Sequence, residues 1–490
     1  MYGWTGVSLR IDLTTGKITR EETASKNVLS KLIGGKGIAS WRAVQEQGSY
    51  QAFSPENRVF ISTGPLQGTN TPAAGRFGLV TKSPLTNAYL DTHAGGYFGP
   101  YLKFAGYDML IIQGRAENPC YLTVFDDEAE LLPANELWGK TTHETEDILK
   151  QNVKNSSVLS IGPAGENLVR IACLTNDKFR NLGRGGAGAI FGYKNLKAIQ
   201  VGGTKHIPIA NEEAFQESIQ DIRNRIKEKR NAGVTFFRVG TPSLVDASNS
   251  RSQLPTRNFQ SGQFDDIDKI NASALEEKFK TRAKPCYRCS ISCARILAEP
   301  LSWADKDAII AVPEYETLAM LGSNCGNTDL ETIIRANHLC NTLGLDTIST
   351  GNIIGFFIEC CEKNLVPNQF QSLILKFGDG DGILHLIEQI ARRKEGISNI
   401  LGEGVMRASE HFPGSSEFAI NIKGLEMAAW DPRGKLGMGV SYAVAACGAS
   451  HLRGWPATMK PPKESALSVI DSLITSQNEK LIKDCLVICH

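Results

Sequence analysis

The spacing of apolar and polar residues divides the chain into a strand-rich first part and a helix-rich remainder. Up to about residue 205, short apolar runs alternate with Gly, Pro and Asn, which is the pattern of β-strands joined by turns. Few helical stretches separate these runs, so they predict an antiparallel sheet system rather than alternating strand–helix units. The runs are residues 7–13, 18–23, 57–64, 76–83, 107–115 and 119–133, and the first two predict a hairpin around a Gly-containing turn.

The helical part begins near residue 211. Asn211 can cap a helix that runs to about Arg230, and Glu212 and Glu213 stand in its first turn, where the helix dipole favours acidic side chains. Further along, apolar residues recur at the i, i+3, i+4 spacing of a helix with a buried face. We therefore expect helices over residues 330–344, 350–364, 381–394 and 465–485.

The length of the chain sets the number of domains. With 490 residues it is too long for one hydrophobic core, so about two to four domains are expected. The change from strands to helices predicts the α+β class, with a β-rich N-terminal domain at 1–208. A mostly helical domain that carries a cysteine cluster follows at 209–415, and a partial, mostly helical C-terminal domain at 416–490.

Charge and composition exclude several classes of protein. The chain has 53 Lys and Arg against 52 Asp and Glu, so it has no global attraction for nucleic acid or an anionic membrane. The N-terminus has no secretory signal pattern, and no run reaches the roughly 18 apolar residues that span a bilayer. Twelve cysteines without an export signal argue against a disulfide framework. We therefore expect a cytoplasmic protein whose cysteines are mostly buried as small apolar side chains.

Three cysteines stand apart in the segment KPCYRCSISCARI: Cys286, Cys289 and Cys293. Thiolates at this spacing can bind three corners of one iron–sulfur cluster, and the fourth ligand must come from elsewhere. A structural zinc ion also takes four thiolates, but usually as two C-x2-C pairs, and no second pair is present. The spacing favours the cluster and leaves a zinc site or inert cysteines open as alternatives.

Several ordered segments are similar to the tungsten-containing aldehyde ferredoxin oxidoreductase family over nearly the whole chain. They include STGPLQGTNTPAAGRFGLVTKSPLT, AGGYFGPYLKFAGYD, GRGGAGAIFGYKNLKAI, PEYETLAMLGSNCG and GLEMAAWDPRG. The resemblance implies a β-rich domain and two helical domains around one tungsten (or molybdenum) atom held by two pterin dithiolenes. It also implies a 4Fe–4S cluster nearby, a small aldehyde as substrate, ferredoxin as electron acceptor and a homodimer.

By this resemblance a set of Arg, Gly and other polar positions contacts the pterins. Pterin phosphates are anionic, and backbone N–H and guanidinium groups bind such oxygens well. The GRGGAG at 183–188 formally fits a dinucleotide fingerprint, but TNDKFRNL precedes it instead of an apolar strand, so a tight pterin-binding loop is the better interpretation. The matched positions are Arg76, His93, Gly95, Arg184, Gly185, Gly186, Gly188 and Arg453, and the family usually has Asn where His93 stands.

Two further segments resemble a family pattern, D-x-x-G-L followed by Asp or Cys, in which each copy binds one pterin. In the first copy Asn341 replaces the opening Asp, and Asp346 closes the segment. The second copy opens with Asp484 and includes Ile488, but Val487 replaces its Gly, so the backbone there must tolerate a β-branched residue.

The same match implies that Cys489 is the fourth cluster ligand. Its offset from Asp484 fits the pattern, and Cys485 is the rival. The chain stops one residue later, at His490, whereas the family continues for roughly a hundred residues, the size of a small domain. We therefore expect a truncated last domain, and an inactive C-terminally truncated fragment is one alternative function.

Acid–base chemistry is expected from Glu316 and His451, which the resemblance places at the tungsten. Aldehyde oxidation consumes water and releases protons, so a carboxylate that activates water and a His that polarises the carbonyl are both useful. On the residues alone, a salt-bridged Glu and a hydrogen-bonded core His are the ordinary interpretations. The matched surroundings of both residues favour the catalytic one.

Other functions stay open at this point. Some relatives keep the cofactors but reduce aromatic thioesters or oxidise other aldehydes, and a zinc-stabilised helical binding protein would have no redox role. Some members also hold a single iron between subunits with a Glu-x-x-His pair and a second His. Here Arg335 takes the Glu position before His338, with His385 as the second His, so no such site is predicted.

Overall fold

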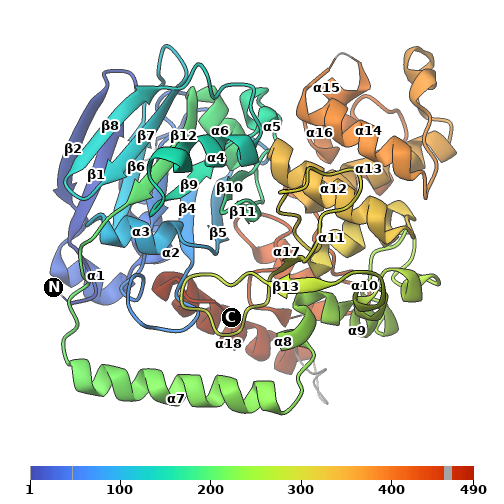
Figure 1. The fold of residues 1–490 in the computed structure, drawn as a ribbon. Coiled ribbons are helices and arrows are strands. Elements are labelled where there is room, and N and C mark those ends of the chain that lie inside the picture. Colours follow the sequence, from blue (N-terminus) through green and yellow to red (C-terminus); the bar gives the residue numbers. More distant parts are fainter. Residues whose placement is uncertain (1, 47, 395, 457–465, 490) are drawn as a thin grey trace.

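The computed structural model describes residues 2–46, 48–394, 396–456 and 466–489. Its N-terminal part contains two six-stranded sheets, and most of the remainder is helical (Figure 1). This arrangement confirms the predicted α+β class with a β-rich N-terminal domain. The boundaries at residues 208 and 415 stay predictions. Among the described residues, no helix combines the length and the apolar character that a membrane span needs.

The first sheet has the strand order β2-β1-β6-β3-β4-β5. Its first two strands form the predicted hairpin, with Ile11 opposite Ile18. All neighbours in this sheet are antiparallel except β1 and β6, which are parallel. The strands are β1 (Val7–Asp12), β2 (Lys17–Glu22), β3 (Val59–Ser62), β4 (Phe77–Lys82), β5 (Tyr89–Ala94) and β6 (Met109–Gln113).

The second sheet has the order β11-β10-β9-β12-β7-β8. Here β12 and β7 are parallel and the other neighbours are antiparallel. The strands are β7 (Cys120–Phe125), β8 (Glu128–Pro133), β9 (Ser157–Ser160), β10 (Leu174–Asn176), β11 (Arg180–Leu182) and β12 (Leu196–Gly202).

Both sheets are therefore mixed: their pairs are mostly antiparallel, as predicted, and each sheet has one parallel pair that the sequence did not predict. Each parallel pair joins strands that are distant in the sequence, because a parallel connection needs a long crossover. Short apolar runs indicate that a strand exists but not which strand it pairs with.

One hydrophobic core joins the two sheets. Leu9 and Ile11 of β1 and Leu122 and Val124 of β7 belong to it, and all four are buried. Helices α3 (Phe98–Phe104) and α6 (Ala187–Tyr193) add side chains to the same core. Helices α1 (Lys26–Leu32) and α2 (Gly35–Glu46) share a separate cluster with β3 and β6, so helices cover the outer face of the first sheet.

The helical part follows after α4 (Thr142–Asn152) and α5 (Pro163–Glu166). A large apolar cluster is built around α12, α13 and α14, and its residues are almost all fully buried. Two short hairpins, β13 (Thr281–Ala283) with β14 (Arg295–Leu297) and β15 (Asn421–Ile422) with β16 (Leu425–Glu426), interrupt the helices. The helices are α8 (Phe236–Val239), α9 (Val245–Ser250), α10 (Ala272–Lys278), α11 (Tyr315–Met320), α12 (Leu330–Leu343), α13 (Thr347–Glu362), α14 (Gly380–Ala391), α15 (Ile397–Leu401), α16 (Val405–Ser409), α17 (Leu436–Val444) and α18 (Ala466–Leu486).

Helix α7 (Glu212–Asn231) lies along one side of the molecule (Figure 1). It begins where predicted, because the Asn211 side chain accepts a hydrogen bond from the Ala214 N–H at 3.0 Å. Ile219 is its one buried residue among those described. The helix is therefore stabilised mainly by its cap and by exposed polar side chains.

Candidate functional site

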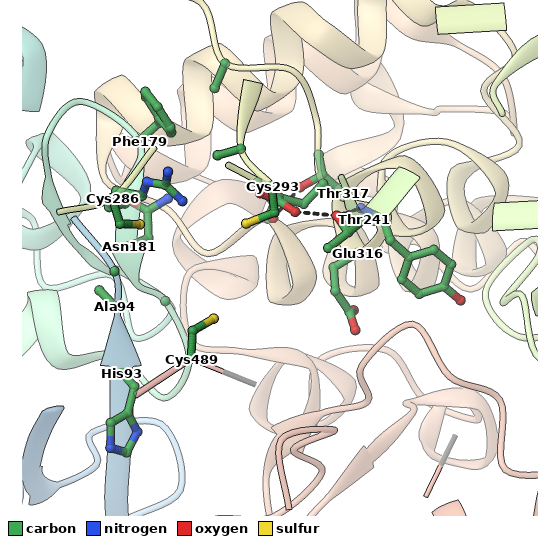
Figure 2. A pocket seen from close by; sticks show the side chains of 18 of the residues that line it. His93, Ala94, Phe179, Asn181, Thr241, Cys286, Cys293, Glu316, Thr317 and Cys489 are labelled. Carbon is green, nitrogen blue, oxygen red and sulfur yellow. Dashed lines mark hydrogen bonds between the residues drawn. The ribbon is translucent and has the colours of Figure 1, made fainter. Parts of the chain in front are cut away.

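A cavity of about 380 Å³ lies where the β-rich part meets the helical part. The end of β5, the residues around β11, the loop between β13 and β14, and helices α11 to α13 all contribute to its wall. Figure 2 shows side chains from these separate elements pointing into one space. Eleven of the predicted site residues line it: Arg76, His93, Gly95, Cys286, Cys289, Cys293, Glu316, Asn341, Asp346, His451 and Cys489.

The three clustered cysteines lie on the loop that joins β13 to β14. The Tyr287 N–H donates to the carbonyl of Gly96 at 3.2 Å, which fixes the loop against the end of β5. The Cys289 N–H donates to the carbonyl of Cys286 at 3.1 Å, which folds the first two cysteines into a turn. All three cysteines line the cavity, so the hairpin presents them together.

Cys489 approaches the same space from the other end of the sequence. It follows α18, and its N–H donates to the carbonyl of Ala73 at 2.9 Å. Figure 2 shows its sulfur facing the region between Cys286 and Cys293. The rival, Cys485, is buried elsewhere, because a Cβ placed on Gly37 of α2 would lie 3.0 Å from its sulfur.

The distances between the cysteine sulfurs distinguish a zinc site from an iron–sulfur cluster site. In a zinc site, metal–sulfur bonds of about 2.3 Å hold the sulfurs about 3.8 Å apart. No three cysteine sulfurs among the described residues lie within 4.8 Å of one another. A cubane cluster binds each thiolate through a different iron, which requires a wider arrangement. The four cysteines fit a cluster better than they fit zinc.

Gly95 gives the cysteine loop room to approach β5. A Cβ at this position would lie 2.8 Å from the sulfur of Cys286, closer than side chains pack. A glycine here is therefore required by the cysteine, whichever cofactor contact the residue also makes.

Arg180 is a site residue that sequence reasoning missed. It lines the cavity, and its Nη2 donates to the carbonyl of Lys284 at 2.8 Å, at the start of the cysteine loop. Burial raises the pKa of the Cys286 and Cys293 thiols, and the Arg180 guanidinium opposes that rise. Arg180 lies just before the glycine-rich loop, and a basic residue at that position is the signal that could have identified it as a site residue.

Glu316 and His451 face each other across the cavity wall, with Glu316 Oε1 3.4 Å from His451 Nδ1. The carboxylate accepts hydrogen bonds from the Ala429 N–H at 2.8 Å and from the Trp430 indole N–H at 2.9 Å. Burial raises the pKa of Glu316 to about 7 and lowers the pKa of His451 to about 3. Near neutral pH the pair therefore combines a carboxyl group close to its titration point with a neutral imidazole.

Asp346 and Arg184 connect the glycine-rich loop to α13. The Asp346 carboxylate accepts hydrogen bonds from the N–H groups of Ile348 and Ser349, each at 3.2 Å, and lies 3.0 Å from Arg184 Nε. Asn341 adds a second link, because its side-chain oxygen accepts a hydrogen bond from Asn181 at 2.7 Å.

Gly185, Gly186 and Gly188 are explained by packing against the protein itself. A Cβ would lie 2.2 Å from the Arg170 carbonyl at Gly186 and 2.3 Å from the Cys173 carbonyl at Gly188. Gly185 and Gly186 also have φ of +83°, which favours glycine. These three are not among the residues that line the cavity, and their contact with a pterin stays a prediction.

A group of buried charged residues lies next to the cavity. Arg453 Nη1 is 2.8 Å from Asp91 Oδ2 and 3.5 Å from Asp484 Oδ2. Lys480 pairs with Asp484 from one turn earlier in α18. Beside them, burial lowers the pKa of His93 to about 3, so its imidazole is neutral, and its Nε2 has no hydrogen-bond partner among the described residues. Arg453 and Asp484 thus lie together but outside the cavity wall.

The second Asp-centred segment keeps the backbone of the first in spite of its substitution. Gly344, in the first copy, ends α12 with φ of +78°, and Val487 has φ of +55° at the corresponding position after α18. Val487 is fully buried, and left-handed backbone is unfavourable for a β-branched residue. The half-buried Ile488 follows it without lining the cavity.

The three residues at the positions of a possible interface iron, Arg335, His338 and His385, have different surroundings. The His338 ring packs edge-on against His143, with centroids 5.3 Å apart. The Arg335 guanidinium lies over the Trp303 ring at 5.9 Å, and His385 is exposed on α14. These contacts are those of ordinary packed and surface side chains.

Comparison with known families agrees with the geometry. Residues 8–203 match the model of the aldehyde ferredoxin oxidoreductase N-terminal domain, and residues 217–490 match that of domains 2 and 3 of the same enzymes. Together these matches cover almost the whole chain. The chain therefore belongs to the aldehyde ferredoxin oxidoreductase family.

Individual relatives support the same assignment. A tungsten-containing aldehyde ferredoxin oxidoreductase from Pyrococcus furiosus is 39% identical over 460 residues, covering 93% of this chain and 75% of the relative. That from Thermococcus kodakarensis is 38% identical with the same coverage. The WOR-like subunit of an aliphatic sulfonate oxidoreductase from P. furiosus is 32% identical over 480 residues, 92% of this chain and 75% of the relative.

A solved structure shows the same fold at greater sequence distance. The active-site complex BamBC of benzoyl coenzyme A reductase, in complex with 1,5-dienoyl-CoA, superimposes with a TM-score of 0.87 at 23% identity. The match covers all of this chain and 82% of that one.

Proposed function

We propose that this protein oxidises a small aldehyde to a carboxylic acid. The reaction is RCHO + H2O → RCOOH + 2 H⁺ + 2 e⁻. The observation that carries the proposal is the placement of the Glu316–His451 pair in one cavity with four cysteines from two distant segments. Such a cavity combines proton transfer with a route for electrons.

The cofactors we propose are a tungsten (or molybdenum) bis-pterin and a 4Fe–4S cluster. When bound, the metal–pterin group supplies the two-electron redox chemistry and the cluster supplies a one-electron relay. Cys286, Cys289, Cys293 and Cys489 would hold the cluster, since all four line the cavity. Arg76 and His93 on one wall and Asn341 and Asp346 on the other would orient the pterins, with Arg184, Arg453 and Asp484 fixing these walls from behind. Gly95, Gly185, Gly186, Gly188 and Ile488 complete the proposed contact set.

Glu316 is the proposed acid–base group. With a pKa of about 7, its carboxylate is available to take a proton from water at neutral pH and to release it again to solvent. The hydrogen bonds from Ala429 and Trp430 hold the carboxylate in one orientation. His451 stays neutral, so its imidazole can donate one hydrogen bond to the aldehyde oxygen without adding a positive charge.

Two points concern substrate and partner. A small aldehyde is proposed over a bulky thioester because relatives that are 38–39% identical over 93% of this chain are named for aldehydes. The relatives that are 38–39% identical are aldehyde enzymes, and their printed names make ferredoxin the proposed electron acceptor. A homodimer and a cytoplasmic location complete the proposal.

Aldehyde-dependent reduction of benzyl viologen tests the proposed function. The protein should be prepared without oxygen from cells supplied with tungstate, and a panel of short aliphatic and aromatic aldehydes should be compared with aromatic thioesters. We expect turnover with aldehydes and formation of one acid per two viologens reduced. Turnover with thioesters alone would contradict the substrate, and none with either in fully metallated protein would contradict the activity.

A further inference from the structure

The strongest local charge in the chain lies around the cysteine loop. Residues 278–295 contain six Lys or Arg and no Asp or Glu, in a chain whose total charge is +1. This concentration of positive charge is distinct from the cysteines on which the family resemblance rests. It raises the question of what the positive charge is for.

Four of these side chains point to solvent and are unpaired. Lys280, Arg282, Lys284 and Arg288 are all exposed, and within the part of the chain that the structure describes none forms an ion pair. We refer to these four residues as the basic face. Unpaired exposed cations of one sign create a positive potential that reaches about one Debye length, roughly 8–10 Å, into solution.

The basic face is the outer side of the loop whose inner side carries the cysteines. Arg288 is exposed, while Cys286 and Cys289 on either side of it line the cavity. The loop therefore places cysteines that line the cavity next to a cation that faces solvent. The ring of Tyr287, next to Cys286, packs edge-on against Tyr97 and Phe104, with centroids 6.1 and 5.9 Å away.

A surface groove extends the basic face. A surface groove of about 380 Å³ is lined by Tyr287 and Arg288 on one side and by Phe104, Lys205 and His206 on the other. Because the groove combines aromatic and basic side chains, it suits contact with a protein better than binding of a free ion.

Helix α7 adds charge at the opposite border of the loop. Arg230 donates a hydrogen bond to the carbonyl of Ser290, which joins the helix end to the cysteine loop. Lys227 and Lys229 of the same helix end are exposed. Of the acidic residues nearby, Glu276 pairs with Arg238 and Asp127 pairs with Lys205, whereas Glu228 and Glu277 are exposed.

We infer that the basic face and its groove are the docking site of an acidic one-electron carrier protein. This inference rests on the proposed function, because the carrier would take its electron from a cluster on Cys286, Cys289, Cys293 and Cys489. In each encounter one electron leaves the reduced cluster and reduces the carrier, with no bond made or broken, so two encounters discharge one aldehyde oxidation. Complementary charge steers the carrier to the loop that carries three of the four cysteines.

Stopped-flow electron transfer tests the inference without any aldehyde. The cluster is reduced with dithionite, excess reductant is removed, and the protein is mixed with an oxidised ferredoxin of net negative charge or with benzyl viologen. Between about 0.02 and 0.3 M salt, we expect the rate with ferredoxin to fall by about tenfold or more and the rate with the cationic viologen not to fall. A ferredoxin rate that is independent of salt would overturn the docking site while leaving the proposed function intact.

Charge reversal locates the site. The variant Arg282→Glu/Lys284→Glu/Arg288→Glu should slow electron transfer to ferredoxin at low salt by about tenfold or more, should not slow the reduction of the cationic viologen, and should leave the cluster spectrum unchanged. The matched control is Lys376→Glu/Arg392→Glu/Lys394→Glu, three exposed residues around α14 that form no ion pair within the described part of the chain, at the opposite end of the molecule from α7 (Figure 1).

Three outcomes would overturn the inference. Equal slowing by the two triple variants would show a general charge effect. Unchanged ferredoxin transfer in the first variant would place docking elsewhere. Tighter binding of a single-stranded DNA oligonucleotide than of ferredoxin at the same salt would assign the face to a nucleic acid. If the first variant loses its cluster, Lys278→Glu/Lys280→Glu, outside the cysteine loop, gives the same test with a smaller expected effect.

Discussion

The carboxylate of Glu316 lies 3.4 Å from the imidazole of His451, and burial moves the pKa values of the two groups in opposite directions. A carboxyl group with a pKa near 7 beside an imidazole that stays neutral is a working acid–base arrangement at neutral pH. The two residues come from α11 and from the segment after α17, so their meeting depends on the whole helical part.

The pH dependence of turnover should follow Glu316. If its carboxylate is the base, kcat/KM rises with pH through about 7 as the proton leaves, and then levels off. His451 adds no limb near neutral pH, because its pKa of about 3 lies far below this range. Rates of viologen reduction between about pH 5 and 9 measure the profile.

Replacement of Glu316 supplies the second half of that test. Glu316→Gln keeps the shape of the side chain and removes the base, so kcat should fall by about 10²- to 10⁴-fold with the cluster spectrum unchanged. The limb near pH 7 should disappear from the residual activity. A limb that persists in this variant would assign the titration to another group.

The fourth cluster ligand can be assigned by comparing two cysteines of one segment. Cys489→Ala should lose iron and the broad absorption of the cluster, because Cys489 lines the cavity with the other three cysteines. Cys485→Ala should keep both, since Cys485 packs against Gly37 of α2. Iron content per folded chain is the measurement, and the reverse result would show that Cys485 is the ligand.

Gly95→Ala should also reduce iron content, for a steric reason. The added methyl group would lie 2.8 Å from the sulfur of Cys286, and a cluster-bound cysteine cannot rotate away. Gly437→Ala is the control, because its methyl group would meet Val469 at an ordinary 3.5 Å. Full iron occupancy in Gly95→Ala would show that the loop moves freely, against the geometry described.

Val487→Gly tests the strained segment before Cys489. The substitution loses the contacts of a buried side chain but relieves a left-handed β-branched residue, so the free energy of unfolding should change by less than about 1 kcal/mol. Val158, fully buried in β9, offers no such relief, and Val158→Gly should cost about 3 kcal/mol or more. Urea unfolding of both variants measures the difference, and equal losses would argue against strain at Val487.

Local sequence patterns predicted local features well. The hairpin of β1 and β2, the Asn211 cap of α7 and the buried helix α13 depend on a few neighbouring residues, and all three are present. The substitution of Gly by Val487 also pointed to an unusual backbone, and φ there is +55°.

Features that depend on distant parts of the chain were not predictable in this way. The parallel pairing of β1 with β6, the contact of Arg453 with Asp91 and the position of Arg180 beside the cysteine loop all join segments far apart in sequence. The glycines of 185–188 show a different limit. Their pattern suggested a ligand loop, and close packing against Arg170 and Cys173 by itself requires glycine at Gly186 and Gly188.

We propose that four cysteines and two Asp-centred segments hold a cluster and a pterin-bound metal beside one another. Elemental analysis of protein purified without oxygen, from cells supplied with tungstate, tests it most directly. We expect about four iron atoms and about one tungsten or molybdenum atom per chain, with the brown colour of an iron–sulfur protein. Zinc alone, in a colourless protein from the same cells, would contradict it.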